Sequence, residues 1–425
     1  MKPHYDVVIV GAGPAGLAAA RAAAGEGASV ALLDDNPHPG GQVWRQGPVF
    51  PAAAPLVEAL GALRASGVEP VSGARVVAAL PERGLLVETA AGGATLRYGR
   101  LVVAPGAREL LLPFPGWTLP GVTGAGGLQA LIKSGVPVRG ERIVIAGSGP
   151  LLVAAYATAR AAGARVAAVL EQAPARAVRR FGLSLLATPS KLWQAARLTR
   201  GFAGSAYLTG SVVRAAHGEA RVEAVRIETD GGGSRVIECD RLACGYGLLP
   251  NLTLARALGC EVRGGAVLVD ARQRTSLDAV YAAGESTGIG GMELARVEGT
   301  IAGLAAADGA ADAARFAALV REREVWRGFA ARVAAAFALG DAARALPPDD
   351  TLLCRCEDVT IGAARAHADA RDAKLLTRCG MGACQGRVCG AAAGVLLDWQ
   401  EAVPRPPFAP VRVATLAALA GEAVR

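Results

Sequence analysis

Cysteines are concentrated near the C-terminus of the 425-residue chain, with a spacing typical of metal ligands. Five of the eight cysteines fall between Cys354 and Cys389. Cys354 and Cys356 form a C-x-C pair, and Cys384 and Cys389 form a C-x4-C pair. Four thiolates in this pattern can hold an iron–sulfur cluster, which passes one electron at a time. We expect these four residues to be the ligands of a [2Fe–2S] cluster.

Zinc is the competing metal, because four thiolates also satisfy its tetrahedral geometry. The C-x4-C spacing, however, departs from the C-x2-C pair of many structural zinc sites. In a reducing compartment, clustered cysteines favour metal ligation over disulfides. The spacing therefore favours [2Fe–2S] and keeps zinc as the alternative.

A glycine fingerprint near the N-terminus indicates a bound dinucleotide. Gly11, Gly13 and Gly16 follow a short apolar run, and Asp34 ends the next apolar run. The first glycine permits a tight turn, the second lets the backbone approach the pyrophosphate, and the third lets helix and strand pack closely. The helix N-terminus then faces the phosphates, and Asp34 can accept hydrogen bonds from the adenosine ribose. We expect FAD here, which accepts two electrons and can release them singly.

The same pattern starts again in the middle of the chain. Gly147 and Gly149 follow the apolar run 142–146, and Glu171 ends the next apolar run. Leu152 occupies the third-glycine position, where a branched side chain either separates helix and strand or fills space that a cofactor would use. Because Glu171 disfavours a 2′-phosphate, NAD or another adenine nucleotide is favoured over NADP. An empty or repurposed fold is the alternative.

Glu285 is a second acid that we expect at the flavin. It follows Gly284 at the point where the apolar run 280–283 passes into a glycine turn. A carboxylate there can accept hydrogen bonds from the ribityl hydroxyls of a flavin. The alternative is a simple strand-to-helix turn.

The chain's own residues are expected to carry cofactors rather than acid–base chemistry. Its four histidines form no obvious pair, and no C-x-x-C motif lies near the first fingerprint. The missing C-x-x-C motif argues against a disulfide reductase. We therefore expect no catalytic residue on this chain.

These motifs predict an α/β flavoprotein with two dinucleotide-binding domains (duplicated Rossmann-like domains) and a small C-terminal helical [2Fe–2S] domain. We expect the FAD-binding domain to be discontinuous, with residues 1–112 and 252–310. The second nucleotide-binding domain should span residues 113–251. The helical C-terminal region should span 311–425, with the cluster module at about 350–395.

Composition and charge bear on partners and location. The net charge is +8, but the basic residues are scattered and aromatic residues make up only 4%, so nucleic-acid binding is not expected. No signal peptide precedes the first apolar run, and the uncharged run 110–132 contains three prolines and five glycines, which exclude a spanning helix. We expect a cytoplasmic protein. The basic and apolar stretch 176–200 is compatible with a membrane surface, and a solvated helix or a partner face is the alternative.

Several segments carry a resemblance to a known family. They are GGQVWR (40–45), PFPGWTLPGV (113–122), AGSGPLL (146–152), AAGESTGIGG (282–291) and the cysteine segment 354–389. Over nearly its whole length the chain resembles the α subunit of opine oxidases, the matching subunit of hydrogen cyanide synthase, and the α subunits of hydroxyproline and dye-linked proline dehydrogenases. The cysteine segment resembles a [2Fe–2S] domain of the bacterioferritin-associated-ferredoxin type.

The resemblance implies that this chain is the electron-accepting α subunit of a hetero-oligomeric amino-acid, opine or imino-acid dehydrogenase. A β subunit similar to glycine and sarcosine oxidases would oxidise the CH–NH or CH–NH2 donor on its own flavin. Electrons would then pass through [2Fe–2S] and FAD to a respiratory acceptor such as a quinone. The resemblance leaves open an FMN at the subunit interface, a small third subunit, ATP at the second nucleotide site, and attachment to the inner face of the cell membrane.

The resemblance also assigns further residues. Gly41 and Gly106 are expected near the FAD, and Cys379 is expected to be a spare thiol. Gln42 and Arg45 are expected at the flavin or at the subunit interface, with ordinary polar loop residues as the alternative. Pro105 departs from the pattern, because relatives usually carry Thr there, and it removes a hydroxyl and an N–H near the flavin.

Two other functions remain open from the residues. One is an autonomous NAD(P)H-dependent reductase that oxidises the nicotinamide at the second fingerprint. The other is a scaffold subunit whose nucleotides are only structural.

Overall fold

The computed structural model describes residues 2–200, 202, 206–308, 313–400 and 403–422. The chain forms two compact units. Unit 1 contains Met1–Arg108, Leu249–Ala330 and Val403–Arg425, and unit 2 contains Glu109–Leu248 and Ala331–Ala402. The predicted domain boundary at residues 310–311 lies outside the described residues, and the division into cofactor domains stays a prediction.

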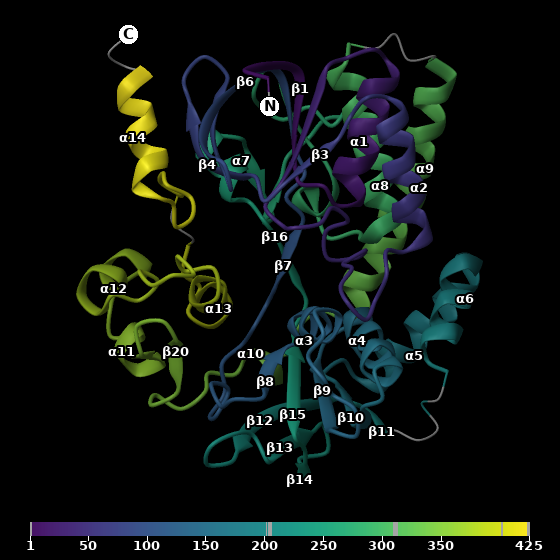
Figure 1. The fold of residues 1–425 in the computed structure, drawn as a ribbon. Helices are drawn as coiled ribbons and strands as arrows, with labels where there is room; N and C mark the ends of the chain where they lie inside the picture. The colour runs from purple at the N-terminus through teal and green to yellow at the C-terminus, as the bar shows by residue number, and fades with distance from the viewer. Residues whose placement is uncertain (1, 201, 203–205, 309–312, 401–402, 423–425) are drawn as a thin grey trace. The chain divides into compact units, whose positions relative to one another are not determined.

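Unit 1 is built on a seven-stranded mixed sheet with the order β3-β2-β1-β6-β5-β4, and β19 also pairs with β6 (Figure 1). The strands β1, β2, β3, β6 and β19 pair with one another in parallel, whereas β4, β5 and β6 form an antiparallel meander. The strand bounds are β1 His4–Val10, β2 Val30–Asp34, β3 Pro70–Ser72, β4 Arg75–Leu80, β5 Gly84–Thr89, β6 Gly92–Val103 and β19 Val280–Ala282.

Helices α1, α2 and α8 and most of α9 belong to unit 1 and lie side by side in Figure 1, and α1 and α8 pack unusually closely. A Cβ atom at Gly299 or Gly303 of α8 would overlap the carbonyl oxygens of Ala15 and Ala19 in α1. These glycines therefore allow the backbones of α1 and α8 to touch. The helices are α1 Pro14–Gly25, α2 Ala54–Ala65, α8 Gly291–Ala306 and α9 Ala313–Ala336, with the smaller α7 Thr253–Leu258 and α14 Val413–Glu422 elsewhere in the unit.

Unit 2 contains a five-stranded parallel sheet with the order β11-β10-β9-β15-β8 and an antiparallel sheet with the order β12-β13-β14. The parallel strands are β8 Val122–Gly124, β9 Arg142–Gly147, β10 Arg165–Glu171, β11 Ala206–Thr209 and β15 Arg241–Gly245. The antiparallel strands are β12 Ser211–His217, β13 Ala224–Thr229 and β14 Ser234–Glu238. The helices are α3 Ala125–Lys133, α4 Pro150–Ala161, α5 Ala175–Ser184, α6 Pro189–Leu198 and α10 Asp341–Arg344.

The cysteine segment of unit 2 folds around a small core of its own. Its elements are β20 Leu352–Cys354, β21 Val359–Thr360, α11 Ile361–Arg365, α12 Ala370–Thr377 and α13 Cys389–Leu396. Thr360 caps α11, because its hydroxyl accepts a hydrogen bond from the Ala363 N–H at 3.2 Å. Helix α13 begins at Cys389.

Short strands complete the fold. β7 Ala107–Glu109 pairs with β16 Leu248–Pro250, and β17 Val262–Arg263 pairs with β18 Ala266–Val267. In the described part of the chain, none of the helices combines the length and the apolar character needed to cross a lipid bilayer.

Candidate cofactor sites

The first glycine turn joins β1 to α1 and leaves space beside its second glycine. A Cβ atom at Gly16 would overlap the carbonyl oxygen of Gly11, so only glycine allows this close packing of helix and turn. At Gly13, by contrast, the nearest atom to an added Cβ is the Cα of Gly41, at 3.9 Å. The turn therefore offers the open approach that a pyrophosphate needs.

Asp34 lies at the end of β2, beside this turn. Its carboxylate is 5% exposed and accepts a hydrogen bond from the Ala12 N–H at 2.6 Å. The other oxygen accepts hydrogen bonds from the backbone and side-chain nitrogens of Asn36, both at 2.8 Å. The acid is thus held where an adenosine ribose would lie.

The loop at Gly41 lies against the first glycine turn, because an added Cβ at Gly41 would lie 3.0 Å from the Cα of Gly13. The N–H of Gly40 donates to the carbonyl oxygen of Ala12 at 2.8 Å. The guanidinium of Arg45 donates to the side chain of Gln42 at 3.1 Å. The first glycine turn (residues 11–16) and the loop 40–45 therefore lie against each other, and we call them the FAD cradle.

Glu285 has one carboxylate oxygen without a partner. Gly284 approaches α1, because an added Cβ would lie 2.8 Å from the Cβ of Ala15. Oε1 of Glu285 accepts a hydrogen bond from the Gly291 N–H at 2.9 Å, and burial raises the pKa of the carboxyl group. Oε2 is buried and has no hydrogen-bond partner among the described residues. An orphaned acceptor of this kind fits a ligand hydroxyl, as expected for a flavin side chain.

Glu298 in α8 positions this turn, and the sequence reasoning missed it. It is 1% exposed and accepts hydrogen bonds from the Gly284 N–H at 3.1 Å and from the Thr287 hydroxyl at 2.7 Å. The guanidinium of Arg327 also forms an ion pair with the Glu298 carboxylate at 3.2 Å. Burial raises the pKa of Glu298, and its hydrogen bonds oppose that rise. The sequence signal that could have revealed this role is an acidic residue on an otherwise apolar face of the helix.

Gly106 follows β6 with a φ of +72°, a conformation that favours glycine. No atom lies within 4 Å of an added Cβ at this position, so one side of the residue is open. Its carbonyl oxygen accepts a hydrogen bond from the Asn251 N–H at 3.0 Å. The space at Gly13 and Gly106 and the free oxygen of Glu285 together fit FAD.

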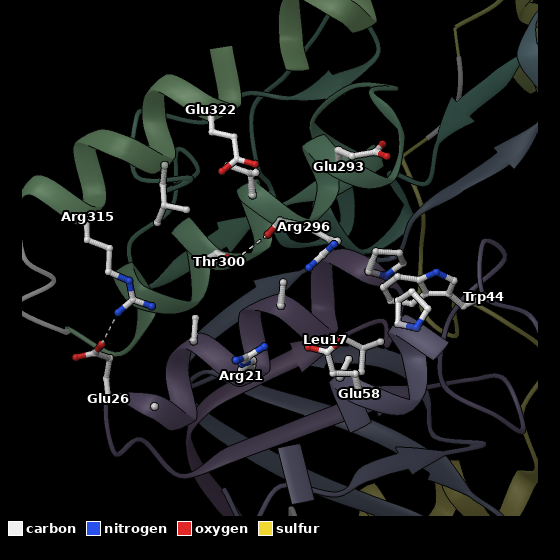
Figure 2. Close-up of a pocket in the computed structure, with 18 residues that line it drawn as sticks. Leu17, Arg21, Glu26, Trp44, Glu58, Glu293, Arg296, Thr300, Arg315 and Glu322 are labelled. Atoms are coloured by element: carbon white, nitrogen blue, oxygen red, sulfur yellow. Dashed lines mark hydrogen bonds and ion pairs between the residues drawn. The ribbon is translucent and has the colours of Figure 1, made fainter. Parts of the chain in front are cut away.

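A groove of about 650 Å³ runs along α1, α2, α8 and α9 (Figure 2). Its lining includes Arg21, Glu58, Arg296 and Glu322, and it does not include Asp34 or the other acid expected at the flavin. Pro14 and Trp44, which adjoin Gly13 and Arg45, also line the groove, so the groove lies directly beside the FAD cradle.

The second glycine turn joins β9 to α4. Glu171 is fully buried, and its two oxygens accept hydrogen bonds from the N–H groups of Gly149 at 2.8 Å and Ala173 at 2.9 Å. Burial raises the pKa of Glu171 to about 7, against the effect of these hydrogen bonds. Leu152 is also fully buried.

Five cysteines gather in the cysteine segment, one more than the predicted ligand set. The sulfur atoms of Cys354, Cys379 and Cys389 all lie within 4.8 Å of one another and are buried. The hydrogen bond between Cys379 and Cys389 lowers the pKa of the first thiol and raises that of the second. Cys356 and Cys384 are hydrogen-bonded to each other through their thiols. Cys379 therefore lies within the group, and its role as a spare thiol stays a prediction.

The donor chemistry of this group fits an iron–sulfur cluster. The side-chain ligand atoms that the described residues bring together here are all thiols, and the Gly380 N–H points at the sulfur of Cys354 at 3.5 Å. N–H groups directed at sulfur stabilise thiolate and cluster charge. Cys356 and Cys384 are less buried than the other three, so this side of the group faces outward.

The side chain of Trp117 contacts β20, the strand that ends at Cys354. The indole N–H of Trp117 donates to the Leu352 carbonyl oxygen at 2.7 Å, and the guanidinium of Arg355 stacks over the Trp117 ring at 4.6 Å. Trp117 and Arg355 line a cavity of about 210 Å³. The buried hydroxyl of Thr123, whose residue also lines the cavity, has no hydrogen-bond partner in the described chain.

Glu109 is a further buried acid that sequence reasoning missed. Its carboxylate accepts hydrogen bonds from the Gly126 and Gly127 N–H groups at 2.7 and 3.0 Å, at the start of α3. Burial raises its pKa. Its local sequence carries no signal, because the partners lie 17 and 18 positions away.

Comparison with protein families finds one model that matches residues 5–299, that of the pyridine nucleotide-disulphide oxidoreductases. The match spans the first glycine turn, the second glycine turn and Glu285. It ends before the cysteine segment.

Curated relatives match over a longer stretch. The chain is 32% identical to an opine oxidase subunit of Rhizobium meliloti, over 99% of this chain and 88% of the relative. It is 34% identical to hydrogen cyanide synthase subunit HcnB of Pseudomonas aeruginosa, over 90% of each chain. The predicted likeness to these two groups is confirmed, whereas the likeness of the cysteine segment to a [2Fe–2S] domain stays a prediction.

The fold is similar to that of L-proline dehydrogenase from P. horikoshii. The TM-score is 0.67, the sequence identity is 19%, and the match covers 97% of this chain and 79% of the other. At this identity the comparison supports the mixed α/β fold with Rossmann-like sheets.

Proposed function

Because the chain belongs to the pyridine nucleotide-disulphide oxidoreductase family, we propose that it is the electron-accepting, cofactor-carrying subunit of a hetero-oligomeric amine dehydrogenase. Family membership makes the chain a flavin-dependent oxidoreductase and implies FAD binding. The finer proposal is that a partner flavoprotein oxidises a CH–NH or CH–NH2 donor and that this chain receives the electrons.

One observation carries the proposal. The similarity to the opine oxidase subunit extends over 99% of the chain, so it includes both the glycine turns and the cysteine segment. Opine oxidase and sarcosine oxidase are both represented among the relatives by one subunit of the enzyme. These names support a multi-subunit enzyme, and we propose that the partner subunit is of the glycine- and sarcosine-oxidase type.

We assign FAD to the cradle of unit 1. The second glycine of the turn leaves room for the pyrophosphate, Asp34 faces the ribose position and Glu285 offers its unpaired oxygen. Bound FAD would supply two-electron acceptance and one-electron release. The proposed FAD residues are Gly11, Gly13, Gly16, Asp34, Gly41, Gln42, Arg45, Gly106, Gly284 and Glu285.

We assign a [2Fe–2S] cluster to the cysteine segment, with Cys354, Cys356, Cys384 and Cys389 as its ligands. The cluster would supply single-electron transfer. The chain's role there is to present thiolates and backbone N–H groups within a small folded core. The respiratory acceptor receives the electrons after they have passed through this chain.

We also propose peripheral attachment to an anionic membrane surface through α5 and α6. Leu183, Leu186 and Trp193 are 70%, 68% and 68% exposed there. Six basic residues and no acidic residue occur between residues 172 and 210. Exposed apolar side chains among basic ones are typical of interfacial helices. Binding to anionic vesicles that is abolished by Trp193→Glu tests this attachment, and equal binding of neutral vesicles contradicts it.

The proposed function is tested by reconstitution with a partner. The chain is co-expressed with a candidate flavoprotein of the glycine-oxidase type, and candidate amino acids, opines and imino acids are added without oxygen. We expect the flavin of this chain to be reduced only when partner and amine are both present. Reduction of the flavin by amine without any partner would contradict the subunit role.

A further inference from the structure

The second glycine turn is covered by the chain's own residues 337–340, here termed the cover segment, which follow α9. The hydroxyl of Ser148, inside the turn, donates a hydrogen bond to the carbonyl oxygen of Phe337 at 2.8 Å. A Cβ atom at Gly149 would lie 3.6 Å from both Cβ and Cγ of Phe337. The Phe337 ring also makes an edge contact with Phe181, with 5.1 Å between the ring centroids. An aromatic side chain thus lies directly on the second glycine of the turn.

The side chain of Gln172 is hydrogen-bonded to the other end of the cover segment. Its amide nitrogen donates to the carbonyl oxygen of Ala338 at 2.9 Å, and its amide oxygen accepts from the Gly340 N–H at 3.0 Å. The same amide nitrogen donates to the Ser148 hydroxyl at 3.0 Å. Gln172 is only 7% exposed, so this side chain is committed to the cover segment.

The two glycine turns of the chain differ at this point. At Gly13 the space that a Cβ would take faces only the Cα of Gly41, whereas at Gly149 the same space faces Phe337. Within the turn itself, the acid of the first fingerprint accepts a hydrogen bond from the N–H of Ala12, whereas Glu171 accepts one from the N–H of Gly149, the second glycine. The N–H group of the second glycine is therefore already used.

The position of Phe337 and the hydrogen bond from Gly149 to Glu171 both oppose a dinucleotide at the second turn. A pyrophosphate binds such a turn by approaching the second glycine and the helix N-terminus, and Phe337 occupies that approach. The acid at the end of β10 normally receives the ribose hydroxyls. Like Asp34, Glu171 accepts a backbone hydrogen bond on each oxygen, but Glu171 is fully buried and one of these bonds takes the N–H of the second glycine. A nucleotide would have to displace the cover segment and also reach a buried acid.

We propose that the cover segment takes the place of a nucleotide at the second turn, with Phe337 and Gln172 as the residues that exclude nicotinamide dinucleotides. The sequence leaves two alternatives at this turn, NAD or another adenine nucleotide and an empty or repurposed fold, and the contacts favour the second. The inference rests on the proposed function only for its consequence, which is that electrons reach the chain from a partner subunit and not from NAD(P)H.

The test measures nucleotide binding to the full-length, FAD-loaded chain by isothermal titration, with NADH and with ATP, in the absence of amine and partner. We expect no saturable binding of either up to about 1 mM. The double variant Phe337→Ala/Gln172→Ala should acquire NADH binding with a Kd below about 100 µM. The control Phe316→Ala, which removes an α9 ring that lies against Arg272, should bind no better than the wild type.

Micromolar binding of NADH or ATP to the wild type would overturn the proposal, as would a folded double variant that binds neither. If the double variant does not fold, hydrogen exchange of the wild type decides. Residues 337–340 should exchange slowly and at the same rate with and without NADH, and rapid exchange would overturn the proposal. Because no amine is used, a failure of the proposed dehydrogenase function leaves this result unaffected.

Discussion

The carboxylate of Glu298 accepts a hydrogen bond from the backbone N–H of Gly284 at 3.1 Å, across 14 positions of the chain. The same carboxylate accepts the Thr287 hydroxyl and pairs with Arg327. The 3-10 turn Gly284–Thr287, which carries Glu285, is therefore fixed by one buried acid.

Glu298→Ala should lower FAD occupancy and destabilise the chain by about 2 kcal/mol or more, because it leaves buried hydrogen-bond donors without an acceptor. The ratio of flavin to protein absorbance and the thermal midpoint measure the two effects. Glu322→Ala, at an exposed position of α9, is the matched control and should change neither. Full FAD content in folded Glu298→Ala would show that the turn does not depend on this acid.

Gly13→Val should abolish FAD binding while leaving the fold intact. Gly13 has a φ of −77°, which valine can adopt, and the nearest atom to an added Cβ lies 3.9 Å away. The new side chain therefore fits the protein and collides only with the pyrophosphate. Gly25→Ala, at the far end of α1 with no neighbour within 4 Å, is the control. Circular dichroism measures whether the fold is intact, and flavin absorbance measures the bound FAD. Retention of FAD by the variant would show that the FAD site lies elsewhere.

Local sequence patterns predicted the positions of the two glycine turns well. The helices α1 and α4 and the strands ending at Asp34 and Glu171 lie where the sequence places them, because glycine spacing and apolar runs act over a few residues. The contacts of Glu298 and the cover segment could not be predicted in this way. Ser148 and Phe337 are 189 positions apart, and no periodicity relates them.

For the cysteine residues, too, local sequence spacing predicted only part of the arrangement. The C-x-C and C-x4-C spacings predicted that four thiols meet, and the glycine-rich loop also brings Cys379 within 4.8 Å of Cys354 and Cys389. Which four of five sulfurs bind iron depends on the loop conformation, and spacing alone does not determine that conformation.

Cys384→Ser should remove the [2Fe–2S] absorbance and leave FAD bound, since the FAD cradle belongs to the other compact unit. Cys379→Ser should keep the iron. Iron analysis and visible spectra of the two variants provide the comparison. Loss of iron in Cys379→Ser with retention in Cys384→Ser would replace the proposed ligand set.

Stability should decrease with rising pH because of Glu171. Burial raises the pKa of Glu171 from 4.5 to about 7, so the folded chain binds a proton that the unfolded chain has already released between these values. The stabilising contribution is complete below pH 4.5 and is lost as the pH rises through 7, by up to about 3 kcal/mol. Urea unfolding of wild type and Glu171→Gln from pH 5 to pH 8 measures this. The wild type should lose stability relative to the variant, and parallel pH profiles would contradict the assignment.

The most direct test of the account is anaerobic reduction of the flavin bound to this chain, followed by absorbance with two electron donors in turn. With the co-expressed partner and its amine, we predict rapid bleaching of the flavin, and with NADH alone we predict none. Stoichiometric bleaching by NADH without the partner would contradict both the subunit role and the closed second turn.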